Sequence, residues 1–289
     1  MPKYLTLEEV EKRHHEIIWP TVRIRAKDAW GSGTVIYSKS DKSGKFHTYI
    51  LTCHHVIASN IKVEKVWDQR VGIEVKKEIR TPVEVQFFYY ENLSYAKGLS
   101  GSHRAEIVCY DERQDIALLE LEMQAREIEW VATLYPEDKI RDVHVYDAVF
   151  ACGAAMAHEP IATDGIITFM NEIIDDYDYW MTTAQIIFGN SGGAVFRYSV
   201  ERDKFEFIGI PARVEVNISG FSAQAITHMG FFVPITRIYN LFRENQYEFL
   251  FNPEVTYEDC EKQRKLKAEE DKKLFMSKYG GSPIEEKRK

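Results

Sequence analysis

The chain has 289 residues, of which 45% are hydrophobic and 28% are charged, the composition of an ordinary globular protein. Its formal net charge of -8 disfavours a nucleic-acid partner, because proteins that bind phosphate backbones carry a basic excess or a basic stripe. No run approaches the roughly 18 apolar residues of a membrane span, and the N-terminus, charged from Lys3 onward, lacks an export signal. We therefore expect a soluble, unexported protein with no membrane partner.

The cysteines are spread along the chain without a CxxC pair or a regular framework, at Cys53, Cys109, Cys152 and Cys260. This spacing predicts neither a zinc site nor a disulfide scaffold, and reduced thiols in a cytoplasm fit it best. The histidines show no HExxH or similar ligand spacing. We expect no metal, no cofactor and a cytoplasmic location.

A helix is predicted at the N-terminus. Thr6 and Glu9 have the spacing of a capping box, and the amphipathic stretch from Leu7 to Ile18 follows them until Trp19-Pro20 closes it. Residues 1–20 therefore form the first predicted segment.

Short β-rich runs separated by turn residues fill most of the remaining chain. They extend from Thr21 to about Glu122 and resume after a connection at Gln124 to Arg141. We expect two β-rich halves, residues 21–130 and residues 131–250, and thus an all-β fold.

Two helical signals close the chain. Pro234 opens a stretch that ends the second half as a terminal helix, whose apolar face carries Ile235, Ile238, Leu241 and Phe242. Residues 251–289 mix acidic and basic side chains densely, which predicts a charged tail that is helical or disordered. The alternative is a docking tail for a protein partner or for self-association.

Three signals in a fixed order carry the chemistry. In YILTCHHVI a predicted strand runs into His55, so an imidazole is expected at the strand edge. In DERQDIALLEL, Asp115 precedes a strongly apolar strand, where a carboxylate can be held partly buried. The third signal is GNSGG, in which Ser191 lies among glycines. Any one of the three is weak alone.

Acyl transfer needs all three groups. A serine hydroxyl such as that of Ser191 is a poor nucleophile until a neighbouring base, here His55, removes its proton. A buried carboxylate such as Asp115 can hold the imidazole in the correct tautomer and stabilise its cation. Gly189 and Ser191 can aim backbone N–H groups at the developing oxyanion.

With these landmarks the chain resembles the trypsin-like, chymotrypsin-fold serine peptidases, and among them the HtrA/Deg-like branch, over roughly Thr21 to Asn245. The matching stretches are GSGTVIY, LTCHHVI, DIALLEL, GNSGGAVF, FIGIPARV and GFFVPI. The resemblance implies two antiparallel six-stranded β-barrels, with His55 and Asp115 from the first barrel and Ser191 from the second.

Departures from the family pattern limit what the resemblance implies. Asn190 stands where digestive members have an aspartate that pairs with a newly cut N-terminus, so activation by such a cleavage is not expected. Only about 40 residues follow the predicted terminal helix, too few for the PDZ domain of the HtrA branch, so PDZ-gated regulation is not expected either.

Three further residues are alternatives to the catalytic residues expected above. His54 neighbours His55, and on a strand the two would point in opposite directions; the family's His-Val step favours His55. Asp111 competes with Asp115, but the triad carboxylate stands directly before the apolar strand, so Asp111 is interpreted as a turn residue. Cys53 lies inside an apolar strand, where a buried thiol is the usual outcome.

The resemblance also implies the substrate pocket. Its floor is set by the residue six before the nucleophile, Gln185, and its walls by residues near Val214 and Gly230. None is acidic, so we expect a medium apolar or uncharged polar side chain rather than Lys or Arg. Arg213, next to one wall, could instead favour an acidic residue.

The sequence thus predicts a cytoplasmic serine endopeptidase that acts on polypeptides. The rival from another class is a catalytically silent double barrel that serves as a binding or structural module. A third alternative is a latent enzyme whose oxyanion loop a partner switches on, and a mobile FGNSGG loop would be its structural sign.

Overall fold

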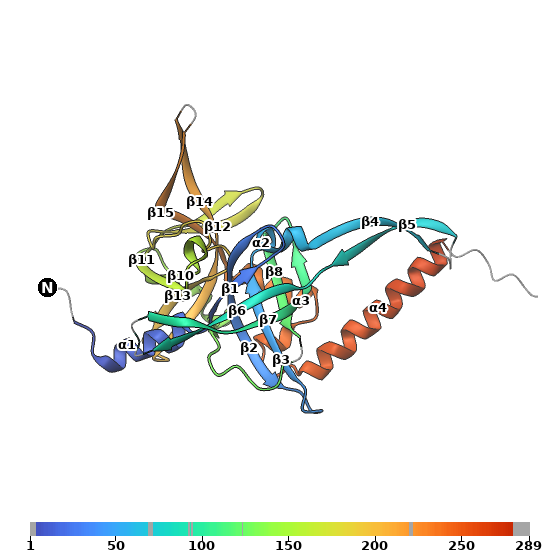
Figure 1. The fold of residues 1–289 in the computed structure, drawn as a ribbon, viewed down its shortest axis with the longest axis horizontal. Coiled ribbons are helices and arrows are strands. Elements are labelled where there is room, and N and C mark those ends of the chain that lie inside the picture. The colour runs from blue at the N-terminus through green and yellow to red at the C-terminus, as the bar shows by residue number, and fades with distance from the viewer. Residues whose placement is uncertain are drawn as a thin grey trace, which may run out of the picture.

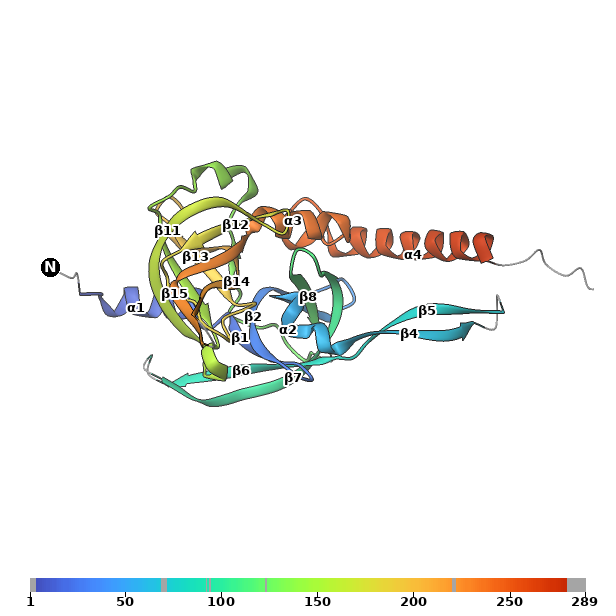
Figure 2. The ribbon, with the colours of Figure 1, turned by 90° about the horizontal axis from the view of Figure 1, so that it is seen from above.

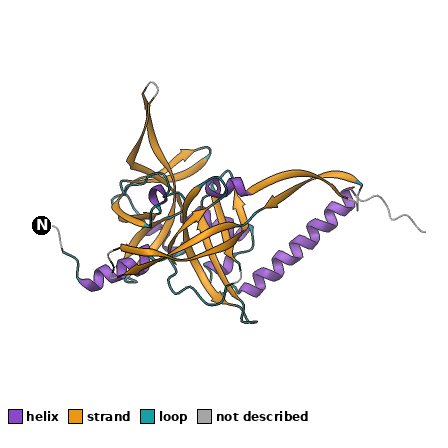
Figure 3. Cartoon of the chain, viewed as in Figure 1, coloured by secondary structure: helices purple, strands orange, loops and turns teal. Residues whose placement is uncertain are grey.

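A computed structural model of the chain describes residues 4–68, 72–91, 93, 95–122, 124–219 and 222–279. Strands form the body of the molecule, and helices lie at its outside (Figure 3). One hydrophobic core cluster includes buried side chains from both halves of the chain, among them Tyr49, Tyr179, Phe196 and Phe232. The all-β prediction is confirmed.

The first half closes into a six-stranded antiparallel barrel in the order β1-β2-β3-β8-β7-β6. Its strands are β1 Thr21–Arg25, β2 Trp30–Ser40, β3 Phe46–Thr52, β6 Val83–Glu91, β7 Tyr95–Asp111 and β8 Ile116–Leu121. Every residue of β8 from Ile116 to Leu119 is fully buried. Since successive side chains point to opposite faces, both faces of this strand are covered, which explains its continuous apolar run.

The second half forms a ring-like antiparallel sheet in the order β13-β10-β11-β12-β15-β14, closed by pairing of β14 with β13. The strands are β10 Ala148–Gly153, β11 Ile161–Ile174, β12 Tyr177–Thr182, β13 Ala194–Ser199, β14 Lys204–Ser219 and β15 Ser222–Pro234. A short strand, β9 Thr133–Leu134, adds to β14 in parallel. The expected pair of barrels is therefore present.

Helices flank both barrels. Thr6 and Glu9 form the predicted capping box of α1 Leu7–Arg13, whose last turn continues as a π-helix, His14–Ile18, rather than as the regular helix expected. The terminal helix α3 Ile235–Glu244 buries its predicted apolar face. Short 3-10 turns complete the set: Ala58–Asn60, Glu137–Asp142, Ala155–Ala157 and Glu248–Leu250.

The charged tail is largely helical. Helix α4 Tyr257–Tyr279 leads away from the body (Figure 1), while residues 280–289 of the predicted tail lie outside the described residues. No helix in the described part of the chain is both long and apolar enough to cross a membrane. All four cysteines are buried and unpaired.

One element was not anticipated from the sequence. Strands β4 Ile61–Asp68 and β5 Ile73–Arg80 pair only with each other, as a two-stranded ribbon that extends from the first barrel on the same side as α4 (Figure 2). Its strands alternate lysine and glutamate with isolated apolar residues, so they lack the run of apolar side chains that marks a barrel strand.

The prediction of a strand that runs into His55 is wrong. Strand β3 ends at Thr52, and the helical turn α2 His54–Ile57 follows. His54 and His55 are therefore separated by the rotation of a helix rather than by the alternation of a strand. His54 is buried and stacks on Tyr110 with ring centroids 4.9 Å apart, whereas His55 is exposed.

Candidate active site

His55 and Asp115 form a two-point contact. The Nδ1 atom of His55 lies 2.8 Å from one carboxylate oxygen of Asp115, and the backbone N–H of His55 donates to the other oxygen at 2.9 Å. The Asp115 side chain is 12% exposed and that of His55 is 49% exposed. Because both carboxylate oxygens are engaged, the ring orientation is fixed while the other ring nitrogen remains available.

The backbone positions Asp115 for this contact. Asp115 has a positive φ of 57°, a left-handed conformation that aspartate tolerates better than most residues. The preceding turn is closed by Asp111, whose carboxylate accepts two hydrogen bonds of 2.9 Å from the backbone and side chain of Gln114. Asp111 is thus occupied in the turn that delivers Asp115.

Ser191 lies in a tight loop between β12 and β13. Its carbonyl accepts the N–H of Ser32 at 2.8 Å, and the N–H of Gly192 donates to Pro211 at 3.0 Å. Gly192 has a φ of 87°, and a Cβ there would come within 2.2 Å of the Ser32 carbonyl oxygen. Only glycine therefore fits next to the serine.

This packing brings Ser191 beside the histidine turn. A Cβ on Gly192 would also lie 3.0 Å from the backbone nitrogen of Cys53, two residues before His55. No hydrogen bond joins Ser191 Oγ to His55 in the described structure. Catalytic hydrogen bonds are often long in unliganded enzymes and tighten when substrate binds, so the lack of this bond does not rule out the pair.

The loop also leaves backbone donors unused. Among the described residues, none accepts a hydrogen bond from the N–H groups of Gly189 and Ser191. The carbonyl of Phe188, on the same peptide unit as the Gly189 N–H, accepts from Met156 N–H at 2.8 Å. Since the C=O and N–H of a trans peptide point in opposite directions, this bond turns the Gly189 N–H away from Met156.

Asn190 has a structural role in the same loop. Its side-chain oxygen accepts the N–H of Ile187 at 3.0 Å, and its own N–H donates to the Ile187 carbonyl at 3.0 Å. Asn190 is 3% exposed. The side chain thus closes the turn from within the chain.

An open cavity of about 570 Å³ lies over the histidine and aspartate. It is lined by His54, His55, Ala58, Glu112, Asp115, Ala212 and Arg213. The two last residues come from β14 of the second barrel, so the cavity lies where the two barrels meet.

The three residues expected to form the substrate pocket differ in position and in exposure. Val214 and Gly230 are register partners on β14 and β15, whereas the side chain of Gln185 is exposed. The buried neighbour Ile186 fills the space beside Gly230, where a Cβ would meet the Ile186 side chain at 2.6 Å. Ile186 was not predicted as a pocket residue. The only indication of it in the sequence is its position five residues before Ser191.

Arg213 lines the cavity over His55 and Asp115, but its charge is paired with a neighbour. Its guanidinium forms an ion pair of 2.8 Å with Asp175 and lies 5.1 Å from the ring centroid of Tyr179. Its charge is therefore largely balanced by a neighbour on the β11–β12 turn.

Cys53 is the remaining reactive group near the pair. Its sulfur, a ring nitrogen of His55 and a carboxylate oxygen of Asp115 lie within 4.8 Å of one another, close enough for three metal ligands. However, burial raises the pKa of the Cys53 thiol well above its usual range, and the sulfur contacts the Pro211 carbonyl at 3.4 Å. A buried, protonated thiol suits neither a metal nor nucleophilic attack, so we assign it neither role.

Comparison with solved structures gives the same fold. The HtrA-type protease AlgW with tripeptide aligns with a TM-score of 0.56 and 19% identity, over 83% of this chain and 64% of that one. The serine endoprotease from Yersinia pestis aligns with a TM-score of 0.55 and 20% identity, over 84% of this chain and 67% of that one. This chain thus spans somewhat under two thirds of the AlgW chain.

Sequence comparison is more specific. No curated protein matches the chain. The family described as the trypsin-like peptidase domain, however, matches residues 31–202, which is more than half of the chain and includes His55, Asp115 and Ser191. This chain therefore belongs to the trypsin-like peptidase family.

Proposed function

We propose that the protein is a serine endopeptidase that hydrolyses peptide bonds of polypeptide substrates without a cofactor. The observation that carries the proposal is the two-point contact between His55 and Asp115, set beside a loop that presents Ser191 with two unused N–H groups. Membership of the trypsin-like peptidase family supports the same reaction class.

The chemistry follows from these positions. Ser191 Oγ attacks the scissile carbonyl carbon while His55 Nε2 takes the hydroxyl proton, and Asp115 stabilises the imidazolium through Nδ1–H. The proton then passes to the nitrogen of the leaving amine as the C–N bond breaks. Water, activated by the same imidazole, hydrolyses the acyl-enzyme and regenerates Ser191.

Gly189 and Ser191 would hold the negative charge on the carbonyl oxygen with their N–H groups. Each such donor typically contributes about 3 to 4 kcal/mol to transition-state stabilisation. The hydrogen bonds that anchor the carbonyls of Phe188, Gly189 and Ser191 support an oxyanion hole that is formed without a partner. They count against the latent and silent alternatives.

We propose that the enzyme prefers substrates whose residue before the scissile bond has an uncharged side chain of small to medium size. Ile186 occupies space beside Gly230, and Arg213 is engaged by Asp175, so the pocket offers little room for a large side chain and the Arg213 cation is not free to attract an acidic one. The docking role of the charged tail and the cytoplasmic location stay predictions.

Fluorophosphonate labelling, read by intact mass, tests the proposal without a known substrate. The parent chain should gain one adduct, and Ser191→Ala and His55→Ala should gain none. His54→Ala and Ser43→Ala are matched controls, because His54 stacks on Tyr110 and Ser43 lies in the turn before β3, and both should keep the adduct. A parent chain that stays unlabelled, or an adduct that survives Ser191→Ala, would refute the assignment.

A further inference from the structure

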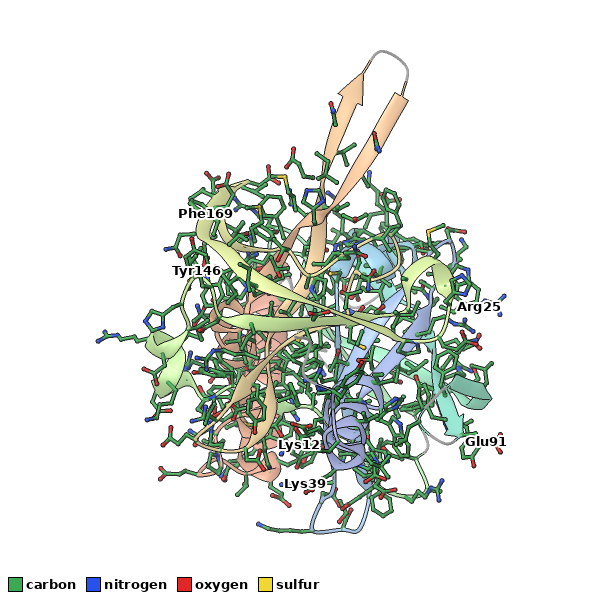
Figure 4. The ribbon with its side chains drawn as sticks, turned by 90° about the vertical axis from the view of Figure 1, so that its left-hand side faces the viewer. Lys12, Arg25, Lys39, Glu91, Tyr146 and Phe169 are labelled. Atoms are coloured by element: carbon green, nitrogen blue, oxygen red, sulfur yellow. The ribbon has the colours of Figure 1, made fainter. Side chains whose placement is uncertain are left out.

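Strand β14 is longer than its place in the barrel requires. Its first part, Lys204 to Gly209, pairs with β13, and pairing with β15 begins at Gly209. From Ile210 to Ser219 it pairs with β15 alone among the described strands. The second part of β14 therefore presents an open sheet edge, in a hairpin that stands clear of the body (Figure 4).

This open edge begins at the catalytic site. Ala212 and Arg213 line the cavity that contains His55 and Asp115, and the N–H of Gly192 donates to the carbonyl of Pro211, next to Ala212 on β14. A polypeptide that lies in the cavity with its carbonyl at Ser191 is therefore already beside β14. It can continue along β14 past Val214, where the register between β14 and β15 shifts.

The edge lacks the usual protection against pairing. Exposed edges are commonly blunted by lysine, proline or inward charges, yet from Val214 to Ser219 the only charged residue is Glu215. Val216 and Ile218 are 38% and 74% exposed. An extended chain could thus pair with this edge through its backbone and rest apolar side chains on these two residues.

We propose that β14 from Glu215 to Ser219 binds substrate residues several positions before the scissile bond, by adding the substrate as an antiparallel strand. The proposal rests on the proposed function and extends the substrate site beyond Val214. Antiparallel pairing is the more stable arrangement, and it runs the substrate's amino-terminal side outward along β14. Five residues at about 3.3 Å each give a strip of roughly 17 Å. Because Val216 and Ile218 are exposed on it, the strip favours uncharged, apolar substrate sequences.

The test compares peptides with one cleavage sequence and different lengths. A short peptide begins about four residues before the scissile bond, and a long one carries about five further apolar residues on its amino side. For the parent chain we expect kcat/KM to be about tenfold higher for the long peptide. An equal extension on the carboxyl side should give no such gain.

A shortened hairpin removes the strip. Glu215 and Ile226 are register partners, so residues 216–225 can be replaced by an Asn-Gly turn that rejoins the two strands. The ratio of kcat/KM between long and short peptides should then fall to about one. The matched control replaces residues 66–75 between the register partners Lys65 and Lys76, which removes the same number of residues from the remote β4–β5 ribbon and should keep the tenfold ratio.

A binding measurement tests this inference separately from the proposed catalytic function. The long peptide, labelled at its amino end, is titrated with Ser191→Ala protein and followed by fluorescence anisotropy, with and without the shortened β14–β15 hairpin. We expect the shortened hairpin to weaken binding about tenfold, even if the parent chain neither labels nor hydrolyses. Equal binding by both proteins, or a length gain that survives shortening, overturns the inference.

Discussion

Ser32 Oγ donates a hydrogen bond of 2.6 Å to the carbonyl of Gly189 and accepts one of 2.7 Å from the N–H of Ala154. The backbone N–H of Ser32 also donates to the carbonyl of Ser191. A single residue of the first barrel thus holds the loop that carries Ser191 on both sides of Asn190. It acts through the loop and does not itself contact the reacting atoms, so it is a positioning residue.

Ser32→Ala should slow fluorophosphonate labelling about tenfold to a hundredfold, because two buried hydrogen bonds worth about 1 kcal/mol each no longer fix the loop. In peptide hydrolysis kcat should fall while KM changes little. Ser38→Ala is the control, since Ser38 is a buried residue of the same strand whose Oγ bonds Thr48 and Ile128. If both variants lose stability but label at the parent rate, Ser32 is only structural.

The family resemblance was enough to predict the double barrel, and it favoured His55 over His54 and Asp115 over Asp111. The structure brings His55 and Asp115 into contact. Loop contacts between distant segments were not predictable. Ser32 lies in GSGTVIY, and nothing in that stretch signals that its hydroxyl bonds Gly189, since the contact depends on how the two barrels pack. The helical turn at His54–Ile57 was missed because β-rich residues precede it without a break.

Gly192→Ala should abolish labelling and lower stability. The new Cβ would lie within 2.2 Å of the Ser32 carbonyl oxygen and 2.3 Å of Thr52 Oγ1, so the loop must move, and the left-handed φ of 87° adds about 1 to 2 kcal/mol of strain. Gly44→Ala is a control for that strain alone, since Gly44 has a φ of 84° and a Cβ there would meet no atom within 4 Å. Chemical denaturation and labelling are measured on both. Normal labelling by Gly192→Ala would show that the loop tolerates a side chain there.

Ile186→Ala should widen the substrate pocket. Removing the side chain that occupies the space beside Gly230 should raise the ratio of kcat/KM for Phe over Val before the scissile bond by about tenfold or more. The cavity left behind should also cost about 2 to 5 kcal/mol of stability, which thermal unfolding measures. Gln185→Ala is the control, because its side chain is exposed, and its ratio should match that of the parent. An unchanged Phe to Val ratio in Ile186→Ala would place the pocket elsewhere.

The loss of folding stability at acid pH should depend on His54. Burial lowers the pKa of His54 from its usual 6.5, and the nearby carboxylates of Glu112 and Asp115 offset this only in part. Between about pH 6.5 and the lower folded-state pKa, the unfolded chain binds more protons than the folded one, so stability present above pH 6.5 is lost as the pH falls. Below the folded-state pKa this loss levels off.

His54→Phe should reduce that loss, because phenylalanine can keep the stacking on Tyr110 but cannot take up a proton. Urea denaturation at about pH 7.5 and pH 5.5 gives the drop in unfolding free energy for each protein. Part of the drop should remain, since burial also lowers the pKa of His14. A variant that loses as much stability as the parent would show that the burial of His54 has no part in the acid response.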